Sequence, residues 1–267
     1  MTKKKILVLA LSLAMVAILA VGGSLAYFTS EDKAENTFTA GGVEIDLIEQ
    51  QVNEAGTALE NFKQGQTLFP IVGSAQGEKD EFGQPIAENY VDKIVTIKNT
   101  GKSAAWVRAY FAIPSALEDG YETFNAGANV LHFNFGNKDG VSTIGEQWIW
   151  DNDTTTTWNY YEVTIDDVRY NVYYADYYQP LDAGATTEQF ISGVYLDKNV
   201  DMKDGKYTDK RHPNADLSIL EGTVKCPVAA VAVQANGFDN AVDAINEAFG
   251  VHYNPFGGTA ENWKDGK

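Results

Sequence analysis

The residues able to hold a catalytic metal are few and far apart in this sequence. The only histidines are His132, His212 and His252, and no H-E-x-x-H motif occurs. Zinc hydrolysis needs about three protein ligands and an open position, commonly with two histidines one helical turn apart and a glutamate base. Histidines scattered in this way are more often loop or strand-edge residues. We therefore predict no metal site and no enzyme activity, with a zinc peptidase as the alternative.

Acidic residues form three short clusters. Residues 197–201 (Asp-Lys-Asn-Val-Asp) begin like a calcium loop, but Met202 stands where the sharp-turn glycine is needed and Thr208 where the bidentate glutamate belongs. The other clusters are residues 151–153 (Asp-Asn-Asp) and the Asp166-Asp167 pair. Glycoside hydrolysis would need a second carboxylate facing such a pair across a cleft. On an acidic chain we interpret all three as solvated loops.

One cysteine and a dense set of aromatic residues complete the chemically distinctive side chains. Cys226 has no partner for a disulfide within the chain and lies in an alternating run, residues 223–228, so we predict a buried strand residue. Five aromatic residues could form a carbohydrate-binding face, but they are more typical of a core with cross-strand pairs. They are Trp148, Trp150, Trp158, Tyr160 and Tyr161.

The overall charge excludes one large class of functions. The chain has 20 basic and 37 acidic residues, a net charge of −17. Loss of Lys3, Lys4 and Lys5 with a processed N-terminus would bring this to −20, since 17 minus 37 is −20. Such a surface repels nucleic acid and anionic membranes. We therefore predict no nucleic-acid partner, while the 44% of hydrophobic residues suffices for a folded core.

The N-terminus has the three parts of a secretory signal peptide. Three lysines precede an apolar run, residues 6–21, and the small-x-small sequence Ser24-Leu25-Ala26 follows. We expect residues 1–26 to be removed, which leaves Tyr27 as the first residue of the secreted protein. The alternative is a retained membrane anchor, but the run is shorter than the roughly 20 residues that span a bilayer. Contact with the membrane is expected only before cleavage.

The elements expected to position these side chains are strands. Alternation of apolar and polar residues, period two, dominates the remaining chain, residues 27–267. The turn at residues 99–101 (Asn-Thr-Gly) predicts an antiparallel hairpin between the strands on either side of it. The predicted strands are residues 43–47, 91–98, 103–113, 130–135, 147–150, 158–165, 168–178, 190–196 and 223–234.

One helix is predicted near the C-terminus. Asp239 or Asn240 can cap it, Ile245 and Phe249 belong to its apolar face, and Gly250 ends it. About nine strands without βαβ alternation indicate an all-β fold, a two-sheet jelly-roll sandwich in a single domain. Polar, glycine-rich insertions are expected as loops at residues 50–66, 73–89, 136–145 and 197–221.

Several motifs near the two ends of the chain are similar to a known family. They lie at residues 22–30 (GGSLAYFTS), 36–41 (NTFTAG), 43–47, 63–66 (KQGQ), 95–103 (VTIKNTGKS) and 233–238 (VQANGF). On these residues the chain resembles the TasA/camelysin family of exported Gram-positive proteins. The resemblance is strongest over the first fifty residues or so and weak in the middle of the chain.

The resemblance implies a fold, a processing enzyme and a mode of assembly. It implies a jelly roll, cleavage by a SipW-type signal peptidase and, in the TasA branch, biofilm-matrix fibres joined head to tail by donor-strand complementation. Carried over to this chain, residues 27–41 would be the donor that completes a sheet of the next copy. The alternative is that this segment is disordered or forms an edge strand of its own subunit. The donor candidates are Tyr27, Phe28, Thr37, Phe38 and Thr39.

The residues themselves are compatible with such a donor. An added strand gains main-chain hydrogen bonds, and Phe28 or Phe38 could fill a side-chain pocket. We predict a secreted structural subunit of biofilm-matrix or cell-surface fibres that binds no cofactor and assembles with itself, with an accessory matrix protein as a further partner. The alternatives are a camelysin-type metallopeptidase and a monomeric adhesin or carbohydrate-binding module.

Overall fold

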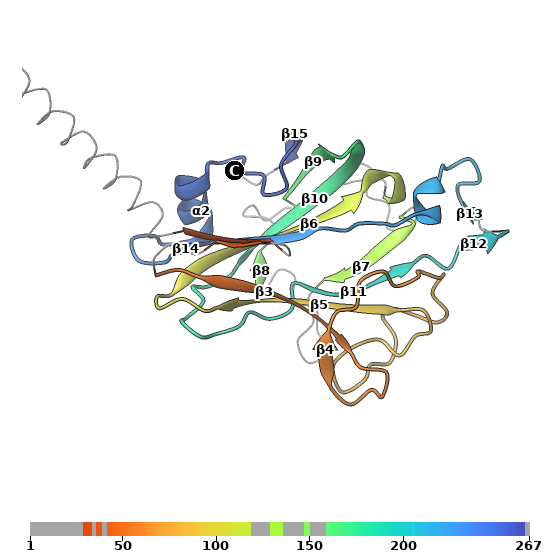
Figure 1. Ribbon diagram of the computed structural model, residues 1–267, viewed down its shortest axis with the longest axis horizontal. Helices are drawn as coiled ribbons and strands as arrows, with labels where there is room; N and C mark the ends of the chain where they lie inside the picture. Colours follow the sequence, from red (N-terminus) through yellow and green to blue (C-terminus); the bar gives the residue numbers. More distant parts are fainter. Residues whose placement is uncertain are drawn as a thin grey trace, which may run out of the picture.

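The protein is a sandwich of two antiparallel β-sheets, as the computed structural model shows (Figure 1). The structure describes residues 29–33, 36–38, 42–118, 129–135, 147–149, 159–204 and 206–264. The all-β prediction is confirmed. The strands that the alternation predicted are present, with ends that shift by a few residues.

The larger sheet has the order β15-β9-β10-β6-β14-β1-β2, and β8 also pairs with β10. Its strands are β1 (Thr29–Lys33), β2 (Asn36–Phe38), β6 (Ala105–Pro114), β8 (Trp148–Ile149), β9 (Tyr160–Ile165), β10 (Val168–Tyr177), β14 (Val228–Gln234) and β15 (Thr259–Lys264).

The smaller sheet has the order β4-β3-β5-β11-β7. Its strands are β3 (Ile45–Val52), β4 (Leu59–Asn61), β5 (Val91–Asn99), β7 (Leu131–Phe135) and β11 (Ile191–Leu196). A separate hairpin pairs β12 (Val200–Lys203) with β13 (Lys206–Asp209), and short 3-10 turns occupy Ser115–Leu117 and Ser218–Glu221.

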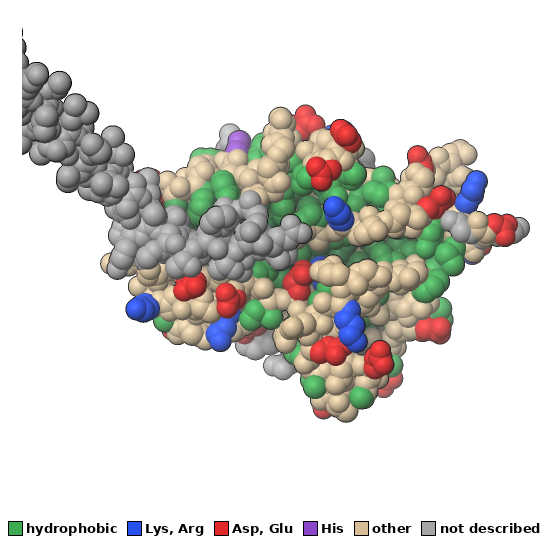
Figure 2. Space-filling view, viewed as in Figure 1, with side chains coloured by type: hydrophobic (Ala, Val, Ile, Leu, Met, Phe, Trp, Pro, Cys, Tyr) green, Lys and Arg blue, Asp and Glu red, His purple; other side chains and the backbone are tan. Residues whose placement is uncertain are grey.

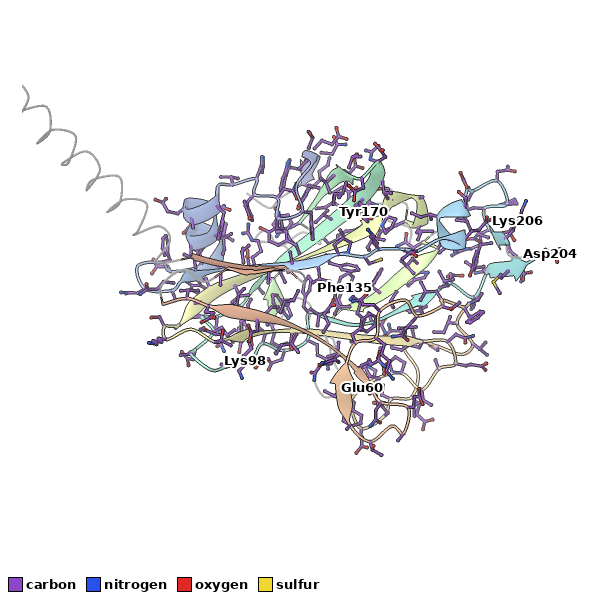
Figure 3. The ribbon with its side chains drawn as sticks, viewed as in Figure 1. Glu60, Lys98, Phe135, Tyr170, Asp204 and Lys206 are labelled. Carbon is purple, nitrogen blue, oxygen red and sulfur yellow. The ribbon has the colours of Figure 1, made fainter. Side chains whose placement is uncertain are left out.

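The main core lies between the sheets. Val107, Ala109 and Phe111 of β6 point into it, and Phe135 of β7 meets the Phe111 ring edge-on with centroids 6.2 Å apart. Figure 3 shows Phe135 in the space between the layers and Lys98 on the outer side of the smaller sheet. Alternate residues of β6, including Tyr110, face the opposite way into a second core. Every residue of β6 is therefore buried.

The predicted helix is confirmed and covers the outer face of the larger sheet (Figure 1). Helix α2 (Ala241–Phe249) begins after Asn240, whose side chain accepts a hydrogen bond from the Asp243 N–H, 2.8 Å. Within the helix, the side chains of Ala244 and Ile245 are fully buried against the sheet. This second layer explains why the larger sheet is apolar on both faces.

The predicted hairpin at residues 99–101 is wrong. β5 and β6 lie in different sheets, so the turn carries the chain from one layer to the other. The buried Asn99 side chain holds this crossing: its Nδ2 donates to the carbonyls of Ser103 (2.9 Å) and Leu181 (2.8 Å), and its Oδ1 accepts from the Gly101 N–H (3.0 Å). Turn residues predict a reversal of the chain but not which strand the reversed chain pairs with.

One predicted strand boundary and two predicted loops also differ from the structure. The strand predicted at residues 223–234 begins only at Val228. Within the predicted loops 50–66 and 197–221, the structure has strand β4 and the β12–β13 hairpin. These are short and largely exposed elements, in which apolar alternation is weak.

Candidate assembly edge

Strand β14 forms the inner side of the candidate site. Its sequence VAAVAVQ consists of small and β-branched residues, and six of its seven residues are buried. Ala230 and Ala232 face the core between the sheets, and Ala229 and Val231 face the core beneath the helix. One side of β14 pairs with β6 over seven residue pairs, so its other side is left to accept a further strand.

The described part of the predicted donor segment occupies that side. β1 pairs antiparallel with β14, from Thr29 opposite Val233 to Lys33 opposite Ala229, and β2 pairs with β1 at the margin of the sheet. Of the donor candidates, Thr37 and Phe38 lie in β2, whereas Tyr27, Phe28 and Thr39 lie outside the described residues. The predicted signal-cleavage residues Ser24 and Ala26 lie outside them as well. In the single chain this segment is therefore an edge strand of its own subunit, which is the alternative interpretation of the sequence.

The edge continues past β1 as a hollow between the layers. Residues 223–227 lead into β14, and the Pro227 carbonyl accepts from the Ala112 N–H of β6, 2.9 Å. In the described chain these residues pair with no strand on the side away from β6. Figure 2 shows hydrophobic side chains at the floor of the hollow. Within this stretch, Val224 and Cys226 are partly buried and pack against the core between the sheets.

A buried ion pair ends the apolar core on the side of the smaller sheet. Glu49 and Lys93 continue the inward-facing rows of β3 and β5, and the Lys93 Nζ lies 2.5 Å from the Glu49 Oε1. The same ammonium lies 4.5 Å from the centre of the Phe62 ring. Both side chains are at most 15% exposed. Removing either one would therefore leave the charge of the other buried without a partner, which destabilises the fold.

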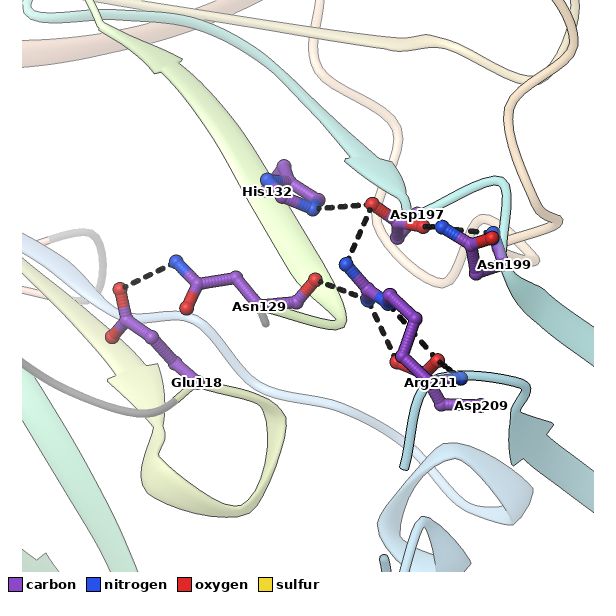
Figure 4. Close-up of polar contacts among 7 residues, drawn as sticks. All are labelled: Glu118, Asn129, His132, Asp197, Asn199, Asp209 and Arg211. Atoms are coloured by element: carbon purple, nitrogen blue, oxygen red, sulfur yellow. Dashed lines mark hydrogen bonds and ion pairs between the residues drawn. The ribbon is translucent and has the colours of Figure 1, made fainter. Parts of the chain in front are cut away.

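The histidines do not form a metal site. His132 donates or accepts a hydrogen bond at 3.0 Å with Asp197, whose carboxylate also contacts Arg211, 3.3 Å (Figure 4). His252 lies beyond the other sheet, stacked on Trp263 with ring centres 4.6 Å apart. No group of three or more His, Cys, Asp or Glu residues suited to a metal occurs within the described ranges.

The calcium-like segment at residues 197–201 is occupied by protein contacts. Asp197 Oδ1 accepts from the main-chain and side-chain N–H groups of Asn199, at 2.7 and 2.8 Å. The Arg211 guanidinium donates hydrogen bonds to the carboxylates of both Asp197 and Asp209 (Figure 4). It also donates to the Asn129 carbonyl, 3.0 Å. The cluster therefore ties the β12–β13 hairpin to β7 and β11.

The other residues that the sequence singled out belong to a turn, to the packed interior or to segments outside the described residues. Asp166 and Asp167 form the exposed β9–β10 turn with φ of 49° and 61°, the conformation of a type I′ hairpin. Cys226 was predicted to be a buried strand residue, but it precedes β14 and its residue is only partly buried. Burial of the thiol itself raises its pKa to about 12, so it stays protonated and unreactive. The acidic residues 151–153 lie outside the described residues.

The described aromatic residues are core residues. Trp148 is fully buried between Tyr177 and Phe190, and its indole N–H donates to the Glu188 carbonyl, 3.2 Å. Tyr160 and Tyr161 are buried on opposite faces of β9. Trp150 and Trp158 lie outside the described ranges. The described members thus form no exposed face for a sugar.

Sequence reasoning missed a second buried ion pair. Arg108 of β6 makes a bidentate contact with Asp176 of β10 at 2.7 and 3.0 Å, beneath helix α2, and both side chains are about 5% exposed. Arg108 also lies over the Tyr174 ring. The alternation correctly placed Arg108 beside Trp106 and Tyr110, but only the helix packed above makes that face a buried one.

No family model, no curated protein and no solved structure matches the chain. In the part of the chain that the structure describes, no helix has the length and apolar character needed to cross a membrane.

Proposed function

We propose that this chain is an exported structural subunit that polymerises into extracellular fibres, and that residues 27–41 pass from one copy to the next. The proposed fold is a jelly roll of the TasA/camelysin kind, to which the N-terminal motifs are similar. The observation that carries the proposal is the pairing of β1 and β2 at the margin of the larger sheet. A marginal strand can leave without opening the rest of the sandwich.

The hydrogen bonds support exchange between copies because they do not depend on which chain supplies the strand. β1 pairs with β14 over five positions, and the two strands lie about 200 residues apart in sequence, between Lys33 and Val228. A second copy of the segment could make the same ladder. A donor that leaves its own subunit exposes its own acceptor edge, so the contact is head to tail and can propagate into a filament.

The hollow beside the edge supports the same proposal. Residues 223–227 extend the acceptor line beyond the Lys33 end of β1, and Val224 and Cys226 pack against the core between the sheets. In the register of β1, a donor that continues past Lys33 as one extended strand would place residues 35–39 opposite residues 227–223, where main-chain groups are available to it.

A disulfide lock tests the proposal. In a Cys226→Ala background, Thr29→Cys combined with Val233→Cys places the two thiols at paired positions, where Cα atoms of antiparallel strands lie about 5 Å apart. Oxidation should hold the donor in its own subunit and keep the secreted protein monomeric by size exclusion and negative-stain microscopy. Reduction should restore fibres. Fibres of the internally locked protein would contradict the proposal.

Mixing the two single variants gives the matched control. Fibres from Thr29→Cys and Val233→Cys copies should contain disulfides between chains, whereas Thr29→Cys mixed with Ala229→Cys should form few, since Ala229 pairs with Lys33.

A secreted chain lacking residues 27–36 should remain monomeric. Fibres from that truncated chain would exclude donor-strand assembly.

A further inference from the structure

The larger sheet has a second margin, where β15 lies beside β9 (Figure 1). One side of β9 pairs with β10 over six residue pairs, in the hairpin closed by the turn at residues 166–167. The other side pairs antiparallel with β15, from Thr259 opposite Thr164 to Lys264 opposite Tyr160. β15 therefore covers main-chain groups of β9 that would otherwise form an open strand edge.

β15 also covers apolar side chains of β9. The Trp263 ring stacks on the Tyr161 ring with centroids 4.0 Å apart, and Ala260 lies opposite Val163. Tyr161 and Val163 are at most 1% exposed and belong to the core beneath helix α2, against which Ala260 and Trp263 pack. The edge of β9 beneath β15 thus combines a row of main-chain donors and acceptors with two apolar side chains, the features that bind a strand of another chain.

β15 itself is a poor template for a further strand. Its register shifts by one residue, since the three-residue step from Glu261 to Lys264 faces a two-residue step from Glu162 to Tyr160. Asn262, within this bulge, is left-handed with φ of 55°, and its Nδ2 donates to the Glu162 Oε2, 2.6 Å. A bulge flanked by charged residues interrupts the regular row of N–H and C=O groups that strand addition needs.

Two glycines bring the chain onto β9 just before β15. Gly257 and Gly258 are both left-handed, with φ of 76° and 73°. A Cβ atom at Gly258 would lie 2.3 Å from the Thr164 carbonyl oxygen, whereas one at Gly257 would meet nothing within 4 Å in the described chain. Alanine would therefore impose the same backbone strain at either position, but only at Gly258 would it push β15 away from β9.

We infer that β9 is a concealed contact surface for β9 of a second copy, and that β15 is the guard strand that keeps it closed. A second copy fits because two β9 edges can pair antiparallel about a two-fold axis, and each then gives the other the main-chain partners and apolar cover that β15 now supplies. Such a contact is isologous and closes as a dimer, unlike the head-to-tail contact at the β14 margin. In the proposed fibres it would join two fibres side by side, and this consequence alone rests on the proposed function.

Sedimentation velocity on a matched pair of glycine variants tests the inference. The background is the oxidised Thr29→Cys/Val233→Cys protein, which can exchange no strand at the β14 margin. There, Gly258→Ala should dimerise as the protein concentration is raised, with a dissociation constant lower by about tenfold or more than that of Gly257→Ala. Equal association of the two variants would overturn the inference, whether or not the unlocked protein forms fibres.

Hydrogen exchange followed by mass spectrometry locates the contact. At low concentration the amides of β9 should exchange faster in Gly258→Ala than in Gly257→Ala, and their protection should return as the dimer forms. Removal of residues 259–267 should strengthen the dimer further, whereas removal of residues 265–267 alone should have no effect. A dimer that leaves β9 unprotected, or a protein with an opened β9 that stays monomeric, would contradict the inference.

Discussion

At the residue scale, the protonation of His132 links the free energy of unfolding to pH. Burial lowers its pKa; Asp197 acts in the opposite direction and Arg211 in the same one. The imidazole also stacks on Tyr195, with ring centres 5.0 Å apart. The folded protein therefore binds a proton here less readily than the unfolded chain does.

This predicts that part of the protein's stability is lost on mild acidification. Below about pH 6.5 the unfolded chain gains a proton that folded His132 does not, so the free energy of unfolding falls as the pH decreases from 7 to 5. His132→Gln, which can still donate to Asp197, should show a smaller decrease in the urea midpoint over this range. His252→Gln changes an exposed histidine and serves as the control. An unchanged pH dependence in His132→Gln would contradict the prediction.

At the scale of elements, the crossing from β5 to β6 decides how the two sheets are connected. Asn99 makes three hydrogen bonds to main-chain groups and is fully buried. Two of these bonds reach Gly101 and Ser103 in the turn, and the third reaches Leu181, which pairs with Ala105 at the start of β6. One side chain thus replaces the ladder that a hairpin would have formed.

Asn99→Ala should destabilise the protein by about 2–4 kcal/mol, because it leaves buried main-chain groups unsatisfied. Urea denaturation followed by tryptophan fluorescence measures the loss. Asn53→Ala removes a comparable side-chain bond, to the Thr57 N–H at 2.9 Å, but in an exposed turn, and should cost below about 1 kcal/mol. Equal losses in the two variants would show that Asn99 does not hold the crossing.

At the scale of the whole molecule, the net charge opposes any contact between copies: it is −17 for the full chain and −20 (17 minus 37) without the three lysines of residues 1–26. Screening at about 0.15 M salt shortens the range of this repulsion to about 8 Å. If the copies exchange strands as proposed, fibre growth should accelerate when NaCl is raised from about 20 to 300 mM. Light scattering follows the growth, and the oxidised Thr29→Cys/Val233→Cys protein is the control. Growth that slows with added salt would contradict this account.

Alternation along the chain predicted the strands that build both cores, because one residue in two of each strand must be apolar when one face is buried. The rows of β6 follow from it directly, whereas helix α2 was predicted from a different pattern, an apolar face at helical spacing with a cap before it and Gly250 after it. Short exposed strands such as β4 and β13 carry no such pattern, so they were missed. The buried pairs Arg108–Asp176 and Lys93–Glu49 were missed for another reason: in sequence, a charge on a strand indicates a solvent-exposed face.

The sequence by itself determined the all-β class, the helix near the C-terminus with a cap at Asp239 or Asn240, and the acidic charge, since these depend on residue types and short spacings. Only the tertiary structure decided which strands are neighbours, that β1 pairs with β14, and that Arg108 and Asp176 form an ion pair beneath helix α2. The reason is physical. Pairing and charge proximity join residues far apart along the chain, and the free energy that selects them comes from packing two sheets and a helix together.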